Sequence, residues 1–251
     1  MGVLFSNTVT ATGDAPLAFS GTNLPGGLLV APDGTISGIP TTAGTFTNVV
    51  LTATNAAGTN SQVATFTIAK GTPVITTPPS TGLALYIWSQ PLNLNGFTEG
   101  SCDVAGTFAF TNPNDLPEVG VTYPSVTFTP LDAGNYNSIT TTVKVTTGKA
   151  SSMFQQVPTA GAITAGQSLE ASSLNGGKMG RWDNQEVSGT FAWANPLTVP
   201  PAGESQQEVV FTPSDPAHYN GASTLILVTV NSAGVSIGNF LPPGTPTNAE
   251  T

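Results

Sequence analysis

A twelve-residue segment that occurs twice constrains the fold of this chain more than any other feature. Residues 126–137 return as residues 209–220, 83 positions later, and seven of the twelve positions are identical: VTFTPLDAGNYN becomes VVFTPSDPAHYN. Gly106–Phe110 aligns with Gly189–Trp193 at the same offset. A period of roughly 80 residues is too long for a solenoid repeat and suits a small β-sandwich. The chain is therefore predicted to contain two copies of one sandwich module.

The composition favours strands and turns over helices. The 251 residues include 28 Gly and 21 Pro, and only 8% are charged. β-Branched side chains suit a pleated surface, whereas Gly and Pro interrupt helices. At roughly 100 residues per sandwich, the length predicts two or three domains.

The charge of the chain excludes some partners. The formal net charge is −9, and Lys and Arg together number 5. So few cations cannot neutralise a run of phosphates, so we expect no nucleic-acid partner. No apolar run is long enough to cross a bilayer, so we expect no direct membrane insertion. The single cysteine, Cys102, excludes an intrachain disulfide. Because Met1 and Gly2 precede what looks like a half-finished strand, we expect the sequence to be a fragment of a longer exported protein.

Four short motifs lie in the first part of the chain. They are Leu24–Leu28 (LPGGL), Asp33–Pro40 (DGTISGIP), Ala43–Phe46 (AGTF) and Leu51–Gly58 (LTATNAAG). In this order they resemble the putative Ig domain family of bacterial surface proteins, which is related in fold to cadherin-like domains. The resemblance spans residues 3–69 and implies an Ig-like sandwich.

The motifs of this first domain contain residues that favour tight turns. Asp33-Gly34 supplies the positive φ of a tight hairpin, and the turns place an expected core between them. The expected core residues are Leu28, Ile36, Phe46, Val50 and Phe66. The family has a further edge strand before the position of Phe5, so domain 1–69 is predicted to lack its first strand.

The two repeats that follow resemble the tandem Ig-like repeats of large bacterial adhesins. The segments that carry the resemblance are Ala162–Leu169 (AITAGQSL), Ser173–Gly177 (SLNGG) and the closing runs 140–145 and 225–230. The predicted domains are residues 1–69, 70–148 and 149–232, with 233–251 as a linker or tail. The predicted fold class is all-β, with tandem Ig-like sandwiches arranged end to end.

Two aromatic patches are candidate binding sites. Trp182 lies between Arg181 and Asp183 in a loop, 175–186, that is longer than its counterpart 95–103. A stacking face beside hydrogen-bonding groups is typical of sugar or peptide binding, although a Trp lying over the edge of its own domain explains the pattern too. Trp88 with Tyr86 forms the second patch.

The repeated segment itself has a structural interpretation. Phe128 and Phe211 point inward, while Tyr136 and Tyr219 pack their rings and tie their hydroxyls to backbone, as in the tyrosine corner of Ig folds. Asp132 and Asp215 cap the turns. The alternative is a calcium site at Asp132 or Asp215, but calcium takes six to eight oxygen ligands and each loop offers one carboxylate. We therefore predict no cofactor, with calcium as the alternative.

Catalysis has little support. The only histidine, His218, replaces Asn135 of the sister repeat in a turn. One His and one Cys cannot form a zinc set, no nucleophile motif is present, and the carboxylates are dispersed. We predict that the chain is not an enzyme.

These inferences predict a non-catalytic Ig-like spacer or stalk of a large bacterial secreted or cell-surface protein, adhesin-like and extracellular. Its expected partners are neighbouring domains of the parent chain, with a glycan or a surface protein as further candidates. The alternatives are a carbohydrate- or protein-binding module, an accessory region of an extracellular polysaccharide-degrading enzyme, or a self-assembling surface fibre or sheath subunit.

Overall fold

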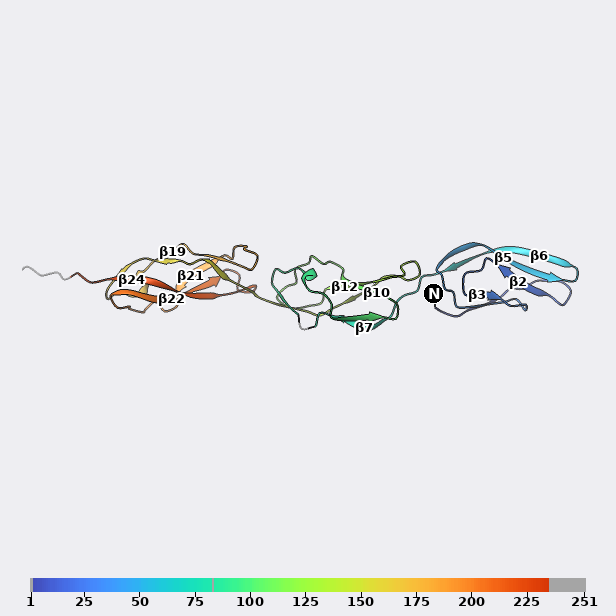
Figure 1. Cartoon of the computed structure of the whole chain (residues 1–251), viewed down its shortest axis with the longest axis horizontal. Coiled ribbons are helices and arrows are strands. Elements are labelled where there is room, and N and C mark those ends of the chain that lie inside the picture. Colours follow the sequence, from blue (N-terminus) through green and yellow to red (C-terminus); the bar gives the residue numbers. More distant parts are fainter. Residues whose placement is uncertain (1, 83, 235–251) are drawn as a thin grey trace, which may run out of the picture. The chain divides into compact units, whose positions relative to one another are not determined.

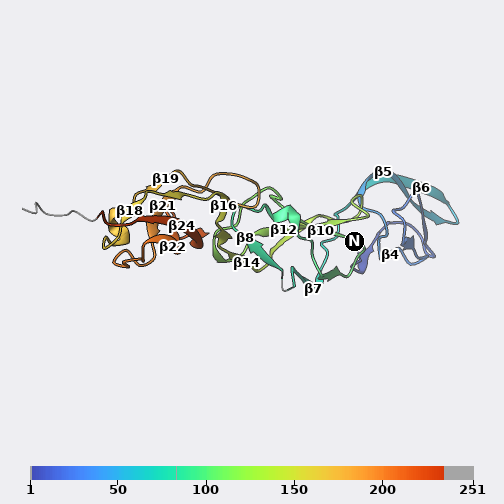
Figure 2. The same cartoon turned by 60° about the vertical axis from the view of Figure 1, so that its left-hand side comes forward.

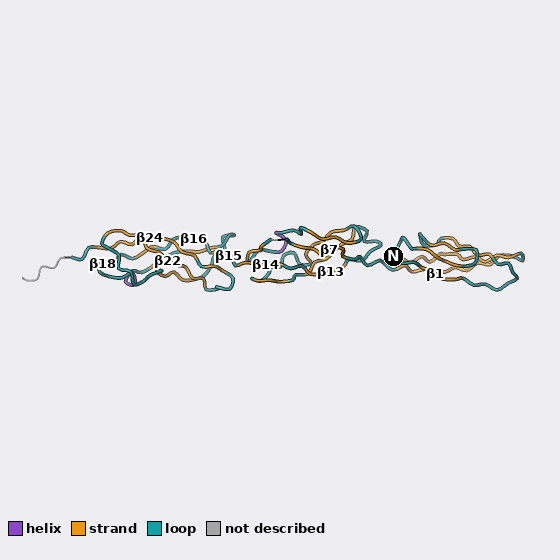
Figure 3. Tube along the Cα trace, turned by 90° about the horizontal axis from the view of Figure 1, so that it is seen from below, coloured by secondary structure: helices purple, strands orange, loops and turns teal. Residues whose placement is uncertain are grey.

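A computed structural model describes residues 2–82 and 84–234 (Figure 1). The fold is all-β, as predicted, with 52% of residues in strands and 3% in helical turns (Figure 3). The chain divides into two compact units that meet between Thr147 and Gly148. The predicted domain boundaries stay predictions, and residues 235–251 of the predicted tail lie outside the described part. Within that part we find no helix whose length and hydropathy would suit it to crossing a bilayer.

Residues 5–68 form two three-stranded sheets, which have the strand orders β1-β4-β3 and β2-β5-β6. Their strands are β1 (Phe5–Thr8), β2 (Ala18–Thr22), β3 (Leu28–Val30), β4 (Thr35–Gly38), β5 (Gly44–Asn55) and β6 (Gly58–Ile68). The predicted Asp33-Gly34 turn closes the β3–β4 hairpin: Gly34 has φ 90° and the Thr35 N–H donates to Asp33 Oδ1 at 2.9 Å.

The core of this sandwich differs from the prediction at three positions, because Phe46, Val50 and Phe66 are only half-buried. Leu28 and Ile36 are buried as expected, but Val49 is fully buried and Val50 is only partly covered. A bulge between Phe46 and Val49 shifts the register of β5 against β6, so the inward-facing position moves by one residue. Phe46 and Phe66 pair across the two strands and are half-buried.

Residues 75–148 contain three small sheets, β10-β12-β13, β11-β14-β8 and β7-β9. The elements are β7 (Ile75–Ser80), β8 (Leu85–Ile87), the 3₁₀ turn η1 (Leu92–Leu94), β9 (Glu99–Cys102), β10 (Gly106–Phe110), β11 (Gly120–Thr122), β12 (Ser125–Pro130), β13 (Ile139–Thr142) and β14 (Val145–Gly148). Their core is a cluster of buried residues: Tyr86, Leu92, Phe110, Val126, Val143 and Val145.

The second unit is built around a four-stranded sheet of order β18-β24-β22-β21. Its elements are β15 (Ala150–Ser151), β16 (Met153–Gln156), β17 (Thr159–Ala160), β18 (Ile163–Thr164), the 3₁₀ turn η2 (Leu169–Ala171), β19 (Leu174–Asn175), β20 (Lys178–Gly180), β21 (Gly189–Trp193), β22 (Gly203–Pro213), β23 (Tyr219–Asn220) and β24 (Ala222–Asn231). Trp193 lies in the core and donates its indole N–H to the Ser172 carbonyl at 3.0 Å.

The repeated segments have the same strand pairing in both copies. β10 pairs with β12 so that Phe108 is opposite Phe128, and β21 pairs with β22 so that Phe191 is opposite Phe211. The ring centroids are 5.0 and 5.1 Å apart, respectively. The sequence repeat therefore corresponds to a repeat of register and aromatic packing.

Candidate functional site

The Trp182 loop, in the segment that connects β20 to β21, is a short hairpin closed by an antiparallel bridge between Gly180 and Glu186. The Asn184 N–H donates to the Arg181 carbonyl at 3.0 Å, and the Arg181 N–H donates to the Gln185 carbonyl at 3.0 Å. Asn184 has φ 62°, in the left-handed region that Asn tolerates better than most residues. A turn followed by one left-handed residue is a common way to close a hairpin with three loop residues.

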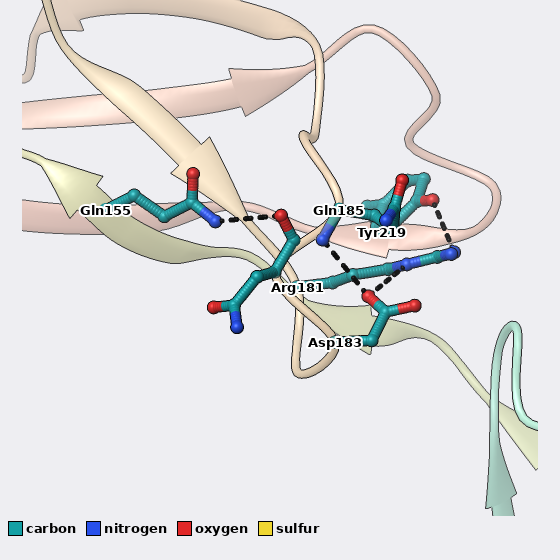
Figure 4. Close-up of polar contacts among 6 residues, drawn as sticks. Gln155, Arg181, Asp183, Gln185 and Tyr219 are labelled. Carbon is teal, nitrogen blue, oxygen red and sulfur yellow. Dashed lines mark hydrogen bonds and ion pairs between the residues drawn. The ribbon is translucent and has the colours of Figure 1, made fainter.

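A polar clamp holds the base of this hairpin (Figure 4). Arg181 Nε donates to Asp183 Oδ1 at 2.7 Å, and Arg181 Nη1 donates to the Tyr219 hydroxyl at 3.4 Å. The Gln185 N–H also donates to Asp183 Oδ1, at 3.3 Å. Gln155 adds a bond from the neighbouring strand, since its Nε2 donates to the Asn184 carbonyl at 3.2 Å. The turn is therefore tied to β16 and β23.

The hydrogen bonds of the clamp shift the pKa values of Arg181 and Asp183. The hydrogen bond from Arg181 lowers the pKa of the Asp183 carboxyl below its usual range, and the same bond raises the pKa of Arg181. Both groups stay ionised at neutral pH. The two side chains are 18% and 26% exposed, so much of their polar surface is turned toward each other.

Trp182 is the residue that this hairpin presents to solvent. It is 48% exposed, whereas Arg181 and Asp183 on either side of it are held by the clamp. An exposed indole on a fixed turn offers a flat apolar face with little conformational entropy left to lose on binding. Such a face can stack on a sugar ring or an aromatic group.

The sister copy has no such hairpin. Residues 103–105 connect β9 to β10, whereas residues 181–188 connect β20 to β21. The predicted difference in loop length is therefore concentrated between these two strands. The two copies have equivalent packing on both sides of the loop: Gly100 contacts Phe108 in one, and Gly177 contacts Phe191 in the other.

The second predicted patch is divided between the core and the surface. Tyr86 is fully buried, and its hydroxyl donates to the Leu92 carbonyl at 3.1 Å. Burial raises the pKa of Tyr86. This corrects the expectation that Tyr86 lies at a binding surface, because the alternation of β8 turns its ring inward. Trp88 is half-buried in the turn that follows.

The weak calcium candidates act as turn caps. Asp132 accepts from the Asn135 N–H at 3.2 Å and from Asn135 Nδ2 at 2.7 Å. Asp215 Oδ2 lies 2.6 Å from His218 Nδ1, and this contact lowers the pKa of the Asp215 carboxyl. Among residues 2–82 and 84–234 there is no group of three or more His, Cys, Asp or Glu that could hold a metal ion.

The residues predicted to be structural lie in or beside the core. Phe128 and Phe211 are buried, and Tyr136 and Tyr219 are half-buried. The Tyr219 hydroxyl, which was expected to bond to backbone, accepts from Arg181 instead. The role of Gln155 was not predicted either, because nothing in the sequence signals that β16 runs beside the hairpin.

The mostly antiparallel sheets, joined by short turns, define the chain as a series of Ig-like β-sandwich modules. Residues 2–69 match the family model described as "Putative Ig domain", which confirms the resemblance found in the motifs of this region. A comparison with curated proteins gives no match.

Several solved structures of tandem domains are similar to this chain. A Drosophila N-cadherin fragment, EC1-3, is 11% identical, with 89% of this chain and 92% of that chain covered and a TM-score of 0.30. The titin I-band fragment I67-I69 is 12% identical, with 93% and 94% covered and a TM-score of 0.34. Sidekick-1 immunoglobulin domains 1-5 are 8% identical, with 92% and 57% covered and a TM-score of 0.28. Likeness at this level says nothing about a ligand or a partner.

Proposed function

We propose that this chain is a non-catalytic Ig-like spacer of a secreted or surface-anchored bacterial protein. The observation that carries the proposal is a repeated anchor at the start of two modules. Lys70 Nζ donates to the Ala133 carbonyl at 2.6 Å, and Lys149 Nζ donates to the Pro216 carbonyl at 2.6 Å. In each case the lysine that opens a module is bound to the turn of the repeated segment in that same module.

The backbone beside each lysine is also fixed. The Gly71 N–H donates to the Asn135 carbonyl at 2.8 Å, and the Ala150 N–H donates to the His218 carbonyl at 2.9 Å. Both residues bridge in parallel to the tyrosine of the repeated segment. Because β6 ends at Ile68 and β14 ends at Gly148, only Ala69 separates the end of β6 from Lys70, and Lys149 follows β14 directly.

Short anchored linkers favour a mechanical role. A flexible linker lets modules collapse onto each other, whereas a linker without free residues transmits the direction of one module to the next. The small fraction of charged residues and the small number of Lys and Arg residues suit a spacer that does not itself bind polyanions. In this proposal the chain holds a more distal adhesive or enzymatic domain away from the cell.

Small-angle X-ray scattering on the full chain tests the spacer. A compact globule of 251 residues has a radius of gyration of about 18 Å by the scaling for folded domains. We expect the radius of gyration, extrapolated to infinite dilution, to be well above that value. A radius near that of a globule would refute the spacer.

The exposed Trp182 favours a second candidate function, a carbohydrate- or protein-binding module. A glycan array probed with the full chain and with Trp182→Ala tests it. Binding that is lost in the variant would support this function, with Leu131→Ala as the matched control because Leu131 is 84% exposed in the other unit. Equal signals from all three proteins would reject it.

A further inference from the structure

The outer face of the four-stranded sheet in the second unit carries exposed aliphatic side chains. β24, β22 and β21 lie side by side in this sheet (Figure 2), and side chains alternate between its two faces. Ile226 and Val228 of β24 point into the core, whereas Leu225 and Leu227 point away from it and are 57% and 58% exposed. Val210 of β22 lies diagonally beside Leu225 on the same outer side and is half-buried. These three residues, Val210, Leu225 and Leu227, form what we call the leucine face.

Carboxylates flank the leucine face on the neighbouring strand. Glu208 is directly opposite Leu225, and Gln206 is directly opposite Leu227. Glu204 occupies the next outward position of β22, and the side chains of all three β22 residues are exposed. The four strands of this sheet, β18, β21, β22 and β24, contain no Lys, Arg or His. The sheet therefore presents apolar surface beside negative charge, with no cation from its own strands.

The sister copy has polar residues at the same positions. β12 pairs with β13 in the register in which β22 pairs with β24, so equivalent positions are 83 residues apart. The positions of Leu225, Leu227, Val210 and Glu208 are taken there by Thr142, Lys144, Thr127 and Ser125, respectively. The buried position between the first two stays apolar in both copies, as Val143 and Ile226. The sister module therefore folds without a leucine face, and core packing does not account for one.

We propose that the leucine face binds a protein partner whose contacting side chains are aliphatic and are flanked by Lys or Arg. Exposed aliphatic side chains on a rigid strand suit a protein interface, because little order is lost when a partner covers them. Glu204 and Glu208 add charge complementarity with a basic partner. They disfavour a second copy of the leucine face, since each copy would bring the same carboxylates to the contact. The spacer role does not depend on this contact, which uses other strands than the Trp182 hairpin.

A random peptide library displayed on phage and selected on the immobilised full chain tests the proposal. We expect the selected peptides to combine aliphatic residues with Lys or Arg. A synthetic copy of the most enriched peptide should bind about tenfold more weakly to Leu225→Thr combined with Leu227→Thr, because the apolar contact of both leucines is lost. Leu131→Thr is the matched control, since this leucine is 84% exposed in the other unit, and it should bind the peptide like the parent.

The folding of the leucine variant is checked separately. Threonine suits an exposed strand position, so we expect the parent and the variant to unfold at the same temperature. Selected peptides that lack Lys and Arg, or that bind the variant as tightly as the parent, overturn the proposal. So does a peptide that loses its binding in Trp182→Ala but keeps it in the leucine variant, because the Trp182 hairpin is then the binding site.

The carboxylates have a test of their own. Glu204→Gln combined with Glu208→Gln should weaken peptide binding and make the affinity less dependent on salt concentration. Glu99→Gln combined with Glu170→Gln is the matched control, because it removes the same charge from two exposed positions outside this sheet. Equal weakening by both pairs shows attraction to the net charge of −9 alone and overturns the assignment of the leucine face.

Sedimentation equilibrium of the full chain distinguishes a second copy from a different protein. We expect the weight-average mass to stay at the monomer value of 25.4 kDa as the concentration rises. A dimer that is lost in Leu225→Thr combined with Leu227→Thr shows that two copies pair through the leucine face, and it overturns the proposed basic partner.

Discussion

At the scale of single residues, two glycines explain why GTF recurs in both copies. A Cβ built on Gly106 would overlap the Phe128 ring and the Thr129 carbonyl, and one on Gly189 would overlap the Phe211 ring and the Thr212 carbonyl. The repeat therefore preserves a close approach of backbone to a buried ring as well as a strand pattern.

Alanine at either glycine should destabilise its module. We expect Gly106→Ala and Gly189→Ala to lower the free energy of unfolding by about 1–3 kcal/mol, the range for an overpacked core. Urea unfolding followed by tryptophan fluorescence measures the change. Gly96→Ala is the control, because its Cβ meets nothing within 4 Å and should be neutral or slightly stabilising. Equal stability of Gly106→Ala and Gly96→Ala would contradict the steric argument.

What the sequence predicts depends on how local the cause is. Turn caps such as Asp33 and Asp132 are local, so their roles follow from residue type and spacing. The buried position of Val49 and the Tyr219–Arg181 bond depend on a bulge and on a neighbouring loop. Neither leaves a signal in the segment concerned. The prediction that Tyr86 lies at a surface was wrong for a similar reason, because the sequence alone does not distinguish an aromatic residue of a surface patch from one of the core.

At the scale of elements, the 181–185 hairpin should be sensitive to acid. Since its folded pKa is lowered, the Asp183 carboxylate contributes stability above its unfolded pKa of about 3.9 and loses it as the pH falls through the folded value. The ion pair is partly exposed, so this contribution should not exceed about 1 kcal/mol. The stability of the hairpin should thus be constant from neutral pH down to about 5 and should decrease below about 3.9.

NMR of the backbone amides of Asn184 and Gln185 measures this transition. Asp183→Asn should remove the titration and leave amide shifts that do not change between neutral and acidic pH. The carboxyl of Asp33 has a pKa lowered by the Thr35 N–H in a different module, so it serves as an internal reference that titrates in both proteins. An identical profile in the parent and in Asp183→Asn would contradict the assigned role.

At the scale of the whole molecule, the sequence repeat predicts the β-sandwich class, but it does not predict the hydrogen bonds that anchor Lys70 and Lys149. Lys70 and Lys149 are exposed residues at module starts, where sequence alone suggests a polar hinge. Their hydrogen bonds to carbonyls 63 and 67 residues away along the chain depend on the folded position of the repeated turn. The structure therefore shows an anchored lysine at the start of both modules.

Replacing these lysines should change the freedom of the modules more than their stability. Lys149→Met keeps the length of the side chain and removes the donor, so each module should stay within about 1 kcal/mol of the parent, because one exposed hydrogen bond contributes little. Distances measured by electron paramagnetic resonance between a spin label in residues 75–140 and another in residues 203–230 should become more broadly distributed. Lys178→Met is the control, since Lys178 pairs only loosely with Glu186, at 3.8 Å, away from the anchors. If Lys149→Met and Lys178→Met give the same distribution as the parent, the anchor does not stiffen the linker, and the spacer proposal loses its main support.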